Sequence, residues 1–195
     1  NGPLTRTIRT VAAIEPDETA LADVTTKFMG WVEKLYVAAT GAQVHEGDPL
    51  FEIYSPELYS AQIEYLLAAK TAETSPNQSA ELLATARTKL KYWDISDAQI
   101  AELEKSRTPQ KTLKILAPID GFVMEKNVIE GQMVNPGQRL YRIADLSLVW
   151  VQAQIYEQDL PFISLGQEAL VTLSYMPDRQ FRGRVTYIYP DVDPK

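Results

Sequence analysis

The sequence predicts a mainly β chain in which a two-part sheet domain is interrupted by an α-helical insert and flanked by strands of a small β-barrel. A 13-residue glycine pattern occurs twice, three helix-start signals lie between its two copies, and short strands with turn residues lie on both flanks. The 12 prolines and 9 glycines are spread along the 195 residues, which favours several small modules over one large globule.

The repeated pattern is G-x-x-V-x-x-G-x-x-L-[FY]-x-I, and it occurs without a gap at residues 41–53 and 131–143. A Gly-aromatic-Val triplet precedes each copy. The repeat glycines are Gly30, Gly41, Gly47, Gly121, Gly131 and Gly137. Gly41 and Gly131 are expected to close turns that need a positive φ, and Gly47 and Gly137 to begin the next strand after a tight bend.

The apolar residues of each copy alternate as they do in strands, so each copy is expected to form a half-sheet with one apolar side. A half-sheet of that size is unstable alone. We therefore predict one split domain of residues 28–53 and 114–143, in which residues 28–53 and 117–143 pack face to face with a pseudo-two-fold relation.

The residues between the two copies, 54–113, are predicted to be helical. Start signals of the N-cap and capping-box type begin at Ser55, Ser75 and Ser96, and apolar residues follow each at helical spacing. The insert is thus predicted to be a hairpin of two arms of about 20 residues, each roughly 30 Å long, with a shorter third helix that returns to the sheet domain.

The flanks are predicted to supply strands to an incomplete β-barrel formed by residues 1–27 and 144–195. Its strands are expected at residues 6–14, 147–156, 169–173 and 181–189, with Pro177 among the turn residues between the last two. Because the modules are nested along the chain, the sequence predicts an elongated multi-domain molecule.

Composition excludes several function classes. Acidic residues outnumber basic ones by 26 to 19, and no basic stripe with interleaved aromatic residues is present, so nucleic acid is not an expected partner. The absence of cysteine excludes thiolate metal sites and cysteine nucleophiles. Residues 1–20 lack the pattern of a signal peptide, and we expect the chain to be a mature or trimmed segment.

The two glycine-punctuated halves resemble the split lipoyl domain, or barrel-sandwich hybrid, of HlyD-type membrane fusion proteins, which is interrupted by an α-hairpin and followed by a β-barrel. Residues 54–66, 150–160 and 183–193 narrow the resemblance to the CusB-like heavy-metal efflux adaptors. The resemblance covers essentially the whole chain.

This resemblance implies a non-enzymatic periplasmic adaptor on the inner-membrane side of the cell envelope. Such an adaptor links an inner-membrane resistance-nodulation-division (RND) pump to an outer-membrane channel, forms a homo-oligomeric ring and serves the export of heavy-metal cations of the Cu/Ag or Zn/Co/Cd class. In the family the hairpin tip faces the channel. The corresponding partner-contact candidates are Thr71, Ala72, Thr74, Ser75 and Asn77.

The alternative is a lipoyl or biotinyl carrier domain of an enzyme complex, which shares this fold. A carrier needs one exposed lysine at the tip between its two halves, whereas here the helical insert occupies that place. Lys111 and Lys114 alternate with Leu113 and Ile115 as solvated strand residues do. We therefore expect no covalent lipoyl or biotin and no other cofactor.

Metal ligands are scarce. His45 is the single histidine, and Met124 and Met133 are the other weak candidates, since thioether sulfur suits Cu(I) or Ag(I). A solvated turn is the favoured interpretation for His45, and core filling is the favoured one for all four methionines. The aromatic residues at the sheet and helix positions, Trp31, Phe51, Trp93, Phe122 and Trp150, are expected in the core.

Overall fold

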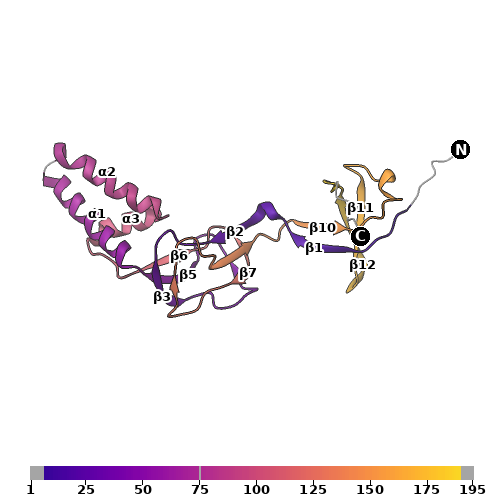
Figure 1. Cartoon of the computed structure of the whole chain (residues 1–195), viewed down its shortest axis with the longest axis horizontal. Coiled ribbons are helices and arrows are strands. Elements are labelled where there is room, and N and C mark those ends of the chain that lie inside the picture. The colour runs from indigo at the N-terminus through magenta and orange to yellow at the C-terminus, as the bar shows by residue number, and fades with distance from the viewer. Residues whose placement is uncertain (1–6, 75, 190–195) are drawn as a thin grey trace. The chain divides into compact units, whose positions relative to one another are not determined.

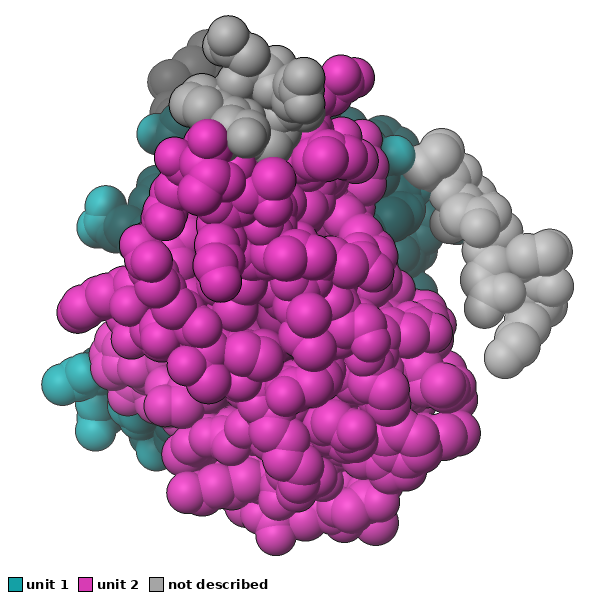
Figure 2. Space-filling view, turned by 90° about the vertical axis from the view of Figure 1, so that its left-hand side faces the viewer, with its two compact units in different colours: residues 1–15, 150–195 teal, residues 16–149 magenta. Residues whose placement is uncertain are grey.

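The computed structural model describes residues 7–74 and 76–189, and the side chains of residues 76–79 are outside the description. The chain divides into two compact units, which are coloured separately in Figure 2. Unit 1 contains residues 1–15 and 150–195, and unit 2 contains residues 16–149.

Unit 2 contains two four-stranded antiparallel sheets and three helices (Figure 1). The strands of the first sheet, in spatial order, are β6 (Thr112–Leu116), β5 (Pro49–Tyr54), β3 (Gly30–Leu35) and β8 (Met133–Val134). Those of the second sheet are β2 (Leu21–Val24), β9 (Tyr141–Ala144), β7 (Gly121–Lys126) and β4 (Gln43–Val44).

The two repeat copies exchange strands. Gly30 of β3 lies opposite Val134 of β8, and Gly121 of β7 lies opposite Val44 of β4, so each sheet contains strands from both copies. The prediction that each copy forms its own half-sheet is therefore wrong, although the two copies do build one unit. The short strands β4 and β8 satisfy their backbone groups by pairing with the other copy.

The core of the sandwich is formed by the same repeat positions from both copies. The fully buried residues at these positions are Val44, Leu50, Phe51, Ile53, Val134, Leu140, Tyr141 and Ile143. They face each other between the two sheets, and their burial provides the main favourable term for folding of this unit.

The repeat glycines have the predicted turn geometry. Gly41 and Gly131 have φ values of +81° and +79°, and both peptide N–H groups donate to the other copy, Gly41 to the carbonyl of Val123 and Gly131 to that of Val32, at 2.7 Å in each case. A positive φ is strained for residues other than glycine. These two turns thus set the direction from which β4 and β8 approach their partners.

The structure places the boundary of the barrel segment differently from the sequence analysis. Residues 1–27 were assigned to the barrel, whereas β2 pairs with β9 and lies within unit 2. In its sheet, β2 takes the place that β6 has in the other sheet. The sequences of β2 and β6 are dissimilar, so the repeat pattern gave no sign that residues 21–24 belong to the sandwich.

The helical insert lies between β5 and β6 and contains α1 (Pro56–Thr74), α2 (Pro76–Tyr92) and α3 (Asp97–Ser106). The first two pack side by side as a hairpin (Figure 1). The capping box at the start of α3 is confirmed, since the Ser96 side chain accepts from the Gln99 N–H and the Gln99 side chain accepts from the Ser96 N–H. The capping box predicted at Ser75 lies outside the described residues.

Among its described residues, unit 1 contains two pairs of strands. β1 (Ala12–Pro16) pairs with β10 (Val149–Ala153), and β11 (Glu168–Leu173) forms an antiparallel hairpin with β12 (Met176–Arg184). No described residue of this unit is fully buried. Pro177 lies within β12 rather than in the turn predicted there, because the chain reverses two residues earlier. Short 3-10 turns occupy Glu18–Ala20 in unit 2 and Leu160–Phe162 in unit 1.

Candidate functional site

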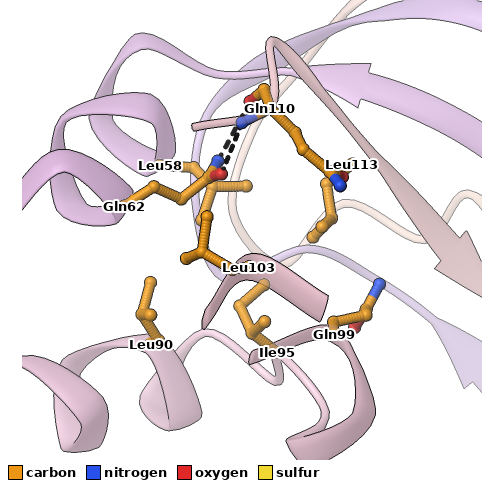
Figure 3. Close-up of a pocket in the computed structure, with 8 residues that line it drawn as sticks. All are labelled: Leu58, Gln62, Leu90, Ile95, Gln99, Leu103, Gln110 and Leu113. Atoms are coloured by element: carbon orange, nitrogen blue, oxygen red, sulfur yellow. Dashed lines mark hydrogen bonds between the residues drawn. The ribbon is translucent and has the colours of Figure 1, made fainter. Parts of the chain in front are cut away.

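The helical insert is fixed to the sandwich at its base. Its first helix begins where the buried Ser55 side chain accepts a hydrogen bond from the Leu58 N–H at 3.3 Å. One turn later, the Gln62 amide donates to the Gln110 carbonyl at 3.1 Å and accepts from the Gln110 N–H at 2.8 Å (Figure 3). This double hydrogen bond, here called the Gln62 clamp, holds the segment between α3 and β6 against α1.

Gln62 was missed in the sequence analysis. It is only 4% exposed and lies among the buried residues Leu58, Ala61 and Tyr65 of α1. A polar side chain on the apolar face of a helix needs a buried partner, and this was the signal that could have identified it. The partner itself was not predictable, because Gln110 is far away in the sequence.

The third helix is attached to α1 by a second, partly buried contact. The Tyr65 hydroxyl donates to the Glu104 carboxylate on α3, and the Tyr65 side chain is fully buried. Burial, together with the hydrogen bond to Glu104, raises the pKa of Tyr65 to about 12. Tyr65 is therefore neutral at physiological pH and acts as a donor in a structural contact.

The space between the three helices and β6 is lined by the side chains drawn in Figure 3. A cavity of only about 10 Å³ remains there, about the volume that one water molecule needs. The lining residues are Leu58, Gln62, Leu90, Ile95, Gln99, Leu103, Gln110 and Leu113. This region is a packed core that sets the direction of the hairpin, and it offers no room for a substrate.

Ion pairs connect the helices farther from the base. Lys89 on α2 lies 2.7 Å from the Glu64 carboxylate on α1, and Arg107 lies 2.8 Å from the Glu73 carboxylate. All four side chains are largely exposed, so each pair contributes at most about 1 kcal/mol. The first pair joins the two arms, and the second joins α1 to the end of α3.

The predicted partner-contact residues lie at the end of the hairpin where α1 finishes. The Thr71 hydroxyl donates to the Leu67 carbonyl at 2.8 Å, and the Thr74 hydroxyl donates to the Thr71 carbonyl at 3.0 Å. Both hydroxyls are thus used within their own helix, which leaves methyl groups and Ala72 for contacts with another molecule. Ser75 and the side chain of Asn77 lie outside the described residues.

Both hairpin arms also expose large apolar side chains. Leu67 on α1 is 64% exposed and Leu82 on α2 is 62% exposed, while Ile63 is 46% exposed. The helices do not need these residues for their own packing. Exposed apolar surface of this kind is common where proteins contact other molecules.

The metal candidates occupy three separate places. His45 lies in an exposed turn with its Nδ1 3.4 Å from the Asp48 carboxylate. Met133 of β8 is opposite Trp31, and Met124 lies at the bulge of β7. Within the described parts of the chain, no group of three His, Asp or Glu side chains is placed to hold a metal ion.

The core assignment is wrong for three of the four methionines and for one tryptophan, whereas Met29 is half-buried. Met124, Met133 and Met176 are 41%, 45% and 38% exposed, and Trp31 is 37% exposed. In β3 and β8 the neighbouring residues Val32 and Val134 point into the core, so Trp31 and Met133 point outward. Alternation in a strand fixes which residues share a face, but not which face is buried.

The lysines weighed for the carrier alternative are both surface residues of the sandwich. Lys111 lies 3.2 Å from the Glu33 carboxylate, and Lys114 lies on β6 opposite Glu52. Neither occupies the tip between the two halves, because the helical insert joins β5 to β6 there.

None of the described helices is long and apolar enough to cross a lipid bilayer.

Two family models match this chain. The model described as CusB, barrel-sandwich hybrid domain, matches residues 21–144. The model described as CusB-like, beta-barrel domain, matches residues 148–195. The first match alone covers more than half of the chain.

Curated relatives match over most of the chain. The cation efflux system protein CusB of Escherichia coli (strain K12) is 27% identical over 192 residues, which are 98% of this chain and 46% of that protein. The putative membrane fusion protein SilB of Salmonella typhimurium is 29% identical over 164 residues, which are 84% of this chain and 37% of that protein. The chain thus spans less than half the length of these two relatives.

Solved structures with the same arrangement include ZneB from Cupriavidus metallidurans, at 26% identity and a TM-score of 0.55 over 90% of this chain and 81% of that chain. A MacA-MexA chimeric protein that contains the Pseudomonas aeruginosa MexA α-hairpin domain has 26% identity and a TM-score of 0.54 over 94% of this chain and 68% of that chain. The predicted fold class, a split barrel-sandwich hybrid interrupted by an α-hairpin and accompanied by a β-barrel, is confirmed.

Proposed function

This chain belongs to the family of CusB-type membrane fusion proteins, and we propose that it is the central part of a periplasmic adaptor that connects an inner-membrane RND pump to an outer-membrane channel. The cargo of the proposed system is a heavy-metal cation of the Cu/Ag or Zn/Co/Cd class. The observation that carries the proposal is the pair of family matches, which follow one another along the chain in the order sandwich and barrel.

The geometry supports a connecting role and no catalytic step. The Gln62 clamp and the Tyr65–Glu104 contact fix the hairpin to the sandwich, so that a force or contact at the hairpin end is transmitted to a packed core. The space at this junction is filled. This arrangement best suits a rigid, non-enzymatic connector.

We assign three structural modules within this role. Residues 54–113 form the helical hairpin module, which starts at the Ser55 cap and ends at β6. The two repeat copies, with β2 added, form the sandwich module, and unit 1 supplies barrel strands. In this assignment the hairpin end near Thr71, Ala72 and Thr74 contacts the outer-membrane channel, and the other modules serve ring assembly and pump contact.

The location that fits this role is the periplasm, at the inner-membrane side of the cell envelope. A ring of identical adaptors around one pump is the assembly we propose. The metal cation is cargo of the pump, and binding of Cu(I) or Ag(I) by this chain is expected to be no tighter than micromolar, about −8 kcal/mol, because its exposed methionines lie at separate places.

A resistance assay tests this function. The full-length protein is expressed from its own promoter in its host, and a deletion strain is compared on Cu, Ag, Zn, Co and Cd salts. We expect the deletion to increase sensitivity to at least one of these metals and the intact gene to restore growth. Unchanged sensitivity to all five would contradict the proposal, and a covalent lipoyl or biotin mass on the intact protein would favour a carrier.

The hairpin contact is tested in the same strain by Thr71→Lys combined with Ala72→Asp. We expect this variant to lose resistance and co-purification with the channel while the protein remains folded. Thr40→Lys is the matched control, because Thr40 is an exposed residue outside the helical insert. Full resistance in the hairpin variant would show that these residues do not contact the channel.

A further inference from the structure

The outer surface of the sheet that contains β9 carries a row of alternating charges. Arg142 on β9 is paired in register with Asp23 on β2 and with Glu125 on β7. Its guanidinium donates to both Asp23 carboxylate oxygens, at 2.7 and 3.0 Å, and to Glu125 at 3.3 Å. We call this row, Asp23–Arg142–Glu125, the acidic-flanked face.

The outer surface of the other sheet carries the opposite row. Glu52 on β5 is paired in register with Lys114 on β6 and with Lys34 on β3. These are the equivalent places in the other sheet, and every charge has the reverse sign. We call this row, Lys114–Glu52–Lys34, the basic-flanked face.

The two rows differ in how their charges are satisfied. On the acidic-flanked face, Arg139 also lies 2.9 Å from Asp23 and 3.4 Å from Glu125, so both carboxylates are paired with arginines of their own chain. On the basic-flanked face, Glu52 accepts hydrogen bonds from the Tyr36 hydroxyl and, at 3.0 Å, from Thr112. The ammonium groups of Lys34 and Lys114 lie 4.7 and 5.8 Å from the Tyr36 ring centroid. Within the described residues neither lysine makes an ion pair, so their charge is available to carboxylates of another molecule.

Apolar side chains accompany both rows. On the basic-flanked face, Trp31 and Met133 are cross-strand neighbours, 37% and 45% exposed, and the Trp31 ring lies 6.3 Å from the Tyr54 ring. The equivalent pair on the acidic-flanked face is Phe122, half-buried, opposite the exposed Gln43. Exposed tryptophan and methionine are enriched in protein interfaces, where aromatic residues carry much of the binding energy.

We propose that the basic-flanked face of one copy docks on the acidic-flanked face of a second copy. This inference rests on the proposed adaptor function and names the surfaces that join neighbouring copies. Lys34 and Lys114 then face Asp23 and Glu125, and Glu52 faces Arg142. The order of positive and negative charges is the same from either end of each row. The charges of the two rows therefore match in both possible directions of the second copy along the row.

The two faces lie on opposite sides of the sandwich, since the sheets share one core between them. Each copy therefore has one face of each kind, and the contact uses different surfaces on the two partners. Such a heterologous contact repeats around a ring when its rotation closes. The charges set the register of the contact, and the Trp31 and Met133 side chains supply apolar contact.

The simplest alternative is that each row only stabilises its own sheet through cross-strand pairing. A second alternative is a contact between two basic-flanked faces. These two alternatives and the proposed contact predict different behaviour for variants that alter one face at a time, because a heterologous contact needs one intact face of each kind.

The test uses two variants of this chain. The basic-face variant carries Lys34→Glu and Lys114→Glu, and the acidic-face variant carries Gln43→Lys and Glu125→Lys, which leaves the Asp23–Arg142 pair in place. Each is checked for folding by circular dichroism and then measured by sedimentation velocity over a concentration series. The wild-type chain should self-associate, and less so in high salt.

We expect each variant alone to remain monomeric, with the dissociation constant raised at least about tenfold. An equal mixture should associate again, at least to a 1:1 dimer, because one intact face of each kind remains in the pair. Three results would overturn the proposal: a wild-type chain that stays monomeric at about 1 mM, a mixture that stays monomeric, or an acidic-face variant that still self-associates alone.

Crosslinking provides a second measurement, since the chain has no cysteine of its own. Gln43→Cys and Met133→Cys proteins are mixed and treated with a short bismaleimide. The mixture should give at least about five times more dimer than either protein alone, and Ser60→Cys, exposed on α1, is the control. Equal yields of crosslinked dimer in all samples would show that these two faces are not in contact. Unchanged metal sensitivity of the deletion strain would instead contradict the adaptor function itself.

Discussion

The rings of Phe51 and Tyr141 stack in the core of the sandwich, with centroids 5.9 Å apart and planes 18° from parallel. The two residues hold the same position in the two copies of the repeat, so the pseudo-two-fold axis passes between them. One difference breaks the symmetry, because the Tyr141 hydroxyl donates to the Val37 carbonyl at 2.7 Å.

Replacing Tyr141 by Phe should therefore leave the stack intact and remove one hydrogen bond. We expect the free energy of unfolding to fall by about 1 kcal/mol for Tyr141→Phe and by about 4 kcal/mol for Tyr141→Ala, which also creates a cavity. Urea unfolding followed by tryptophan fluorescence measures both. Equal losses for the two variants would show that the hydroxyl, and not the stacked ring, is what stabilises this position.

Alkaline pH should destabilise the fold through two buried tyrosines. Burial raises the pKa of both Tyr65 and Tyr141 to about 12, from an ordinary value of 10.0. The folded state thus favours the neutral phenol. This contribution is complete below pH 10 and is lost as pH rises from 10 to 12. Thermal unfolding across that range should show a steeper decline for wild type than for Tyr65→Phe/Tyr141→Phe, and parallel declines would contradict the assignment.

Gly30 and Gly121 should tolerate no side chain. A Cβ on Gly30 would lie 2.5 Å from the Tyr54 carbonyl oxygen, and one on Gly121 would collide with the Ala144 carbonyl. We expect Gly30→Ala and Gly121→Ala each to destabilise unit 2 by about 3 kcal/mol through overpacking. The control is Gly183→Ala, whose Cβ meets no atom within 4 Å. A loss below about 0.5 kcal/mol at Gly30 would mean that the strands separate easily there.

The Gln62 clamp should be the main polar attachment of the hairpin base. Gln62→Ala leaves the Gln110 N–H and carbonyl without their partner, at a cost of about 2 kcal/mol. Hydrogen exchange should become faster in residues 107–113, next to the clamp, while the β9 sheet remains protected. The exposed Gln158 serves as the matched control for Gln→Ala. Unchanged exchange at Gln110 would show that packing alone holds this segment.

Acid should weaken the acidic-flanked face. The hydrogen bond from Arg142, helped by the charge of Arg139, holds the pKa of Asp23 below its ordinary value of 3.8. The folded state favours the carboxylate, so this contribution is present above pH 3.8 and is lost as pH falls through the lowered value. The difference in unfolding free energy between wild type and Asp23→Asn should shrink below about pH 4. If this difference in unfolding free energy does not vary with pH, the stabilising role of the Asp23 carboxylate is contradicted.

Several features were determined by residues close together in the sequence. The turns at Gly41 and Gly131 follow from a backbone conformation that glycine adopts most easily. The caps at Ser55 and Ser96 follow from side chains that reach N–H groups three residues away. Such features involve one or two turns of chain, and their residue types carry enough information to identify them.

Only the tertiary structure decided how the copies combine. Pairing of β3 with β8 and of β4 with β7 depends on strands that are far apart along the chain. Their glycine and valine patterns are compatible with half-sheets as well as with exchange, because alternation specifies a face and not a partner. For the same reason β2 was placed in the wrong module.

The outward position of Trp31 and Met133, and the partner of Gln62, likewise became visible only in the folded chain. Whether a strand face is core or surface depends on where the second sheet lies, and a buried amide acquires a partner only when distant segments meet. The sequence by itself determined the turns, the caps and the repeat. Long-range packing decided the pairing of the strands and which of their faces remain open to another molecule.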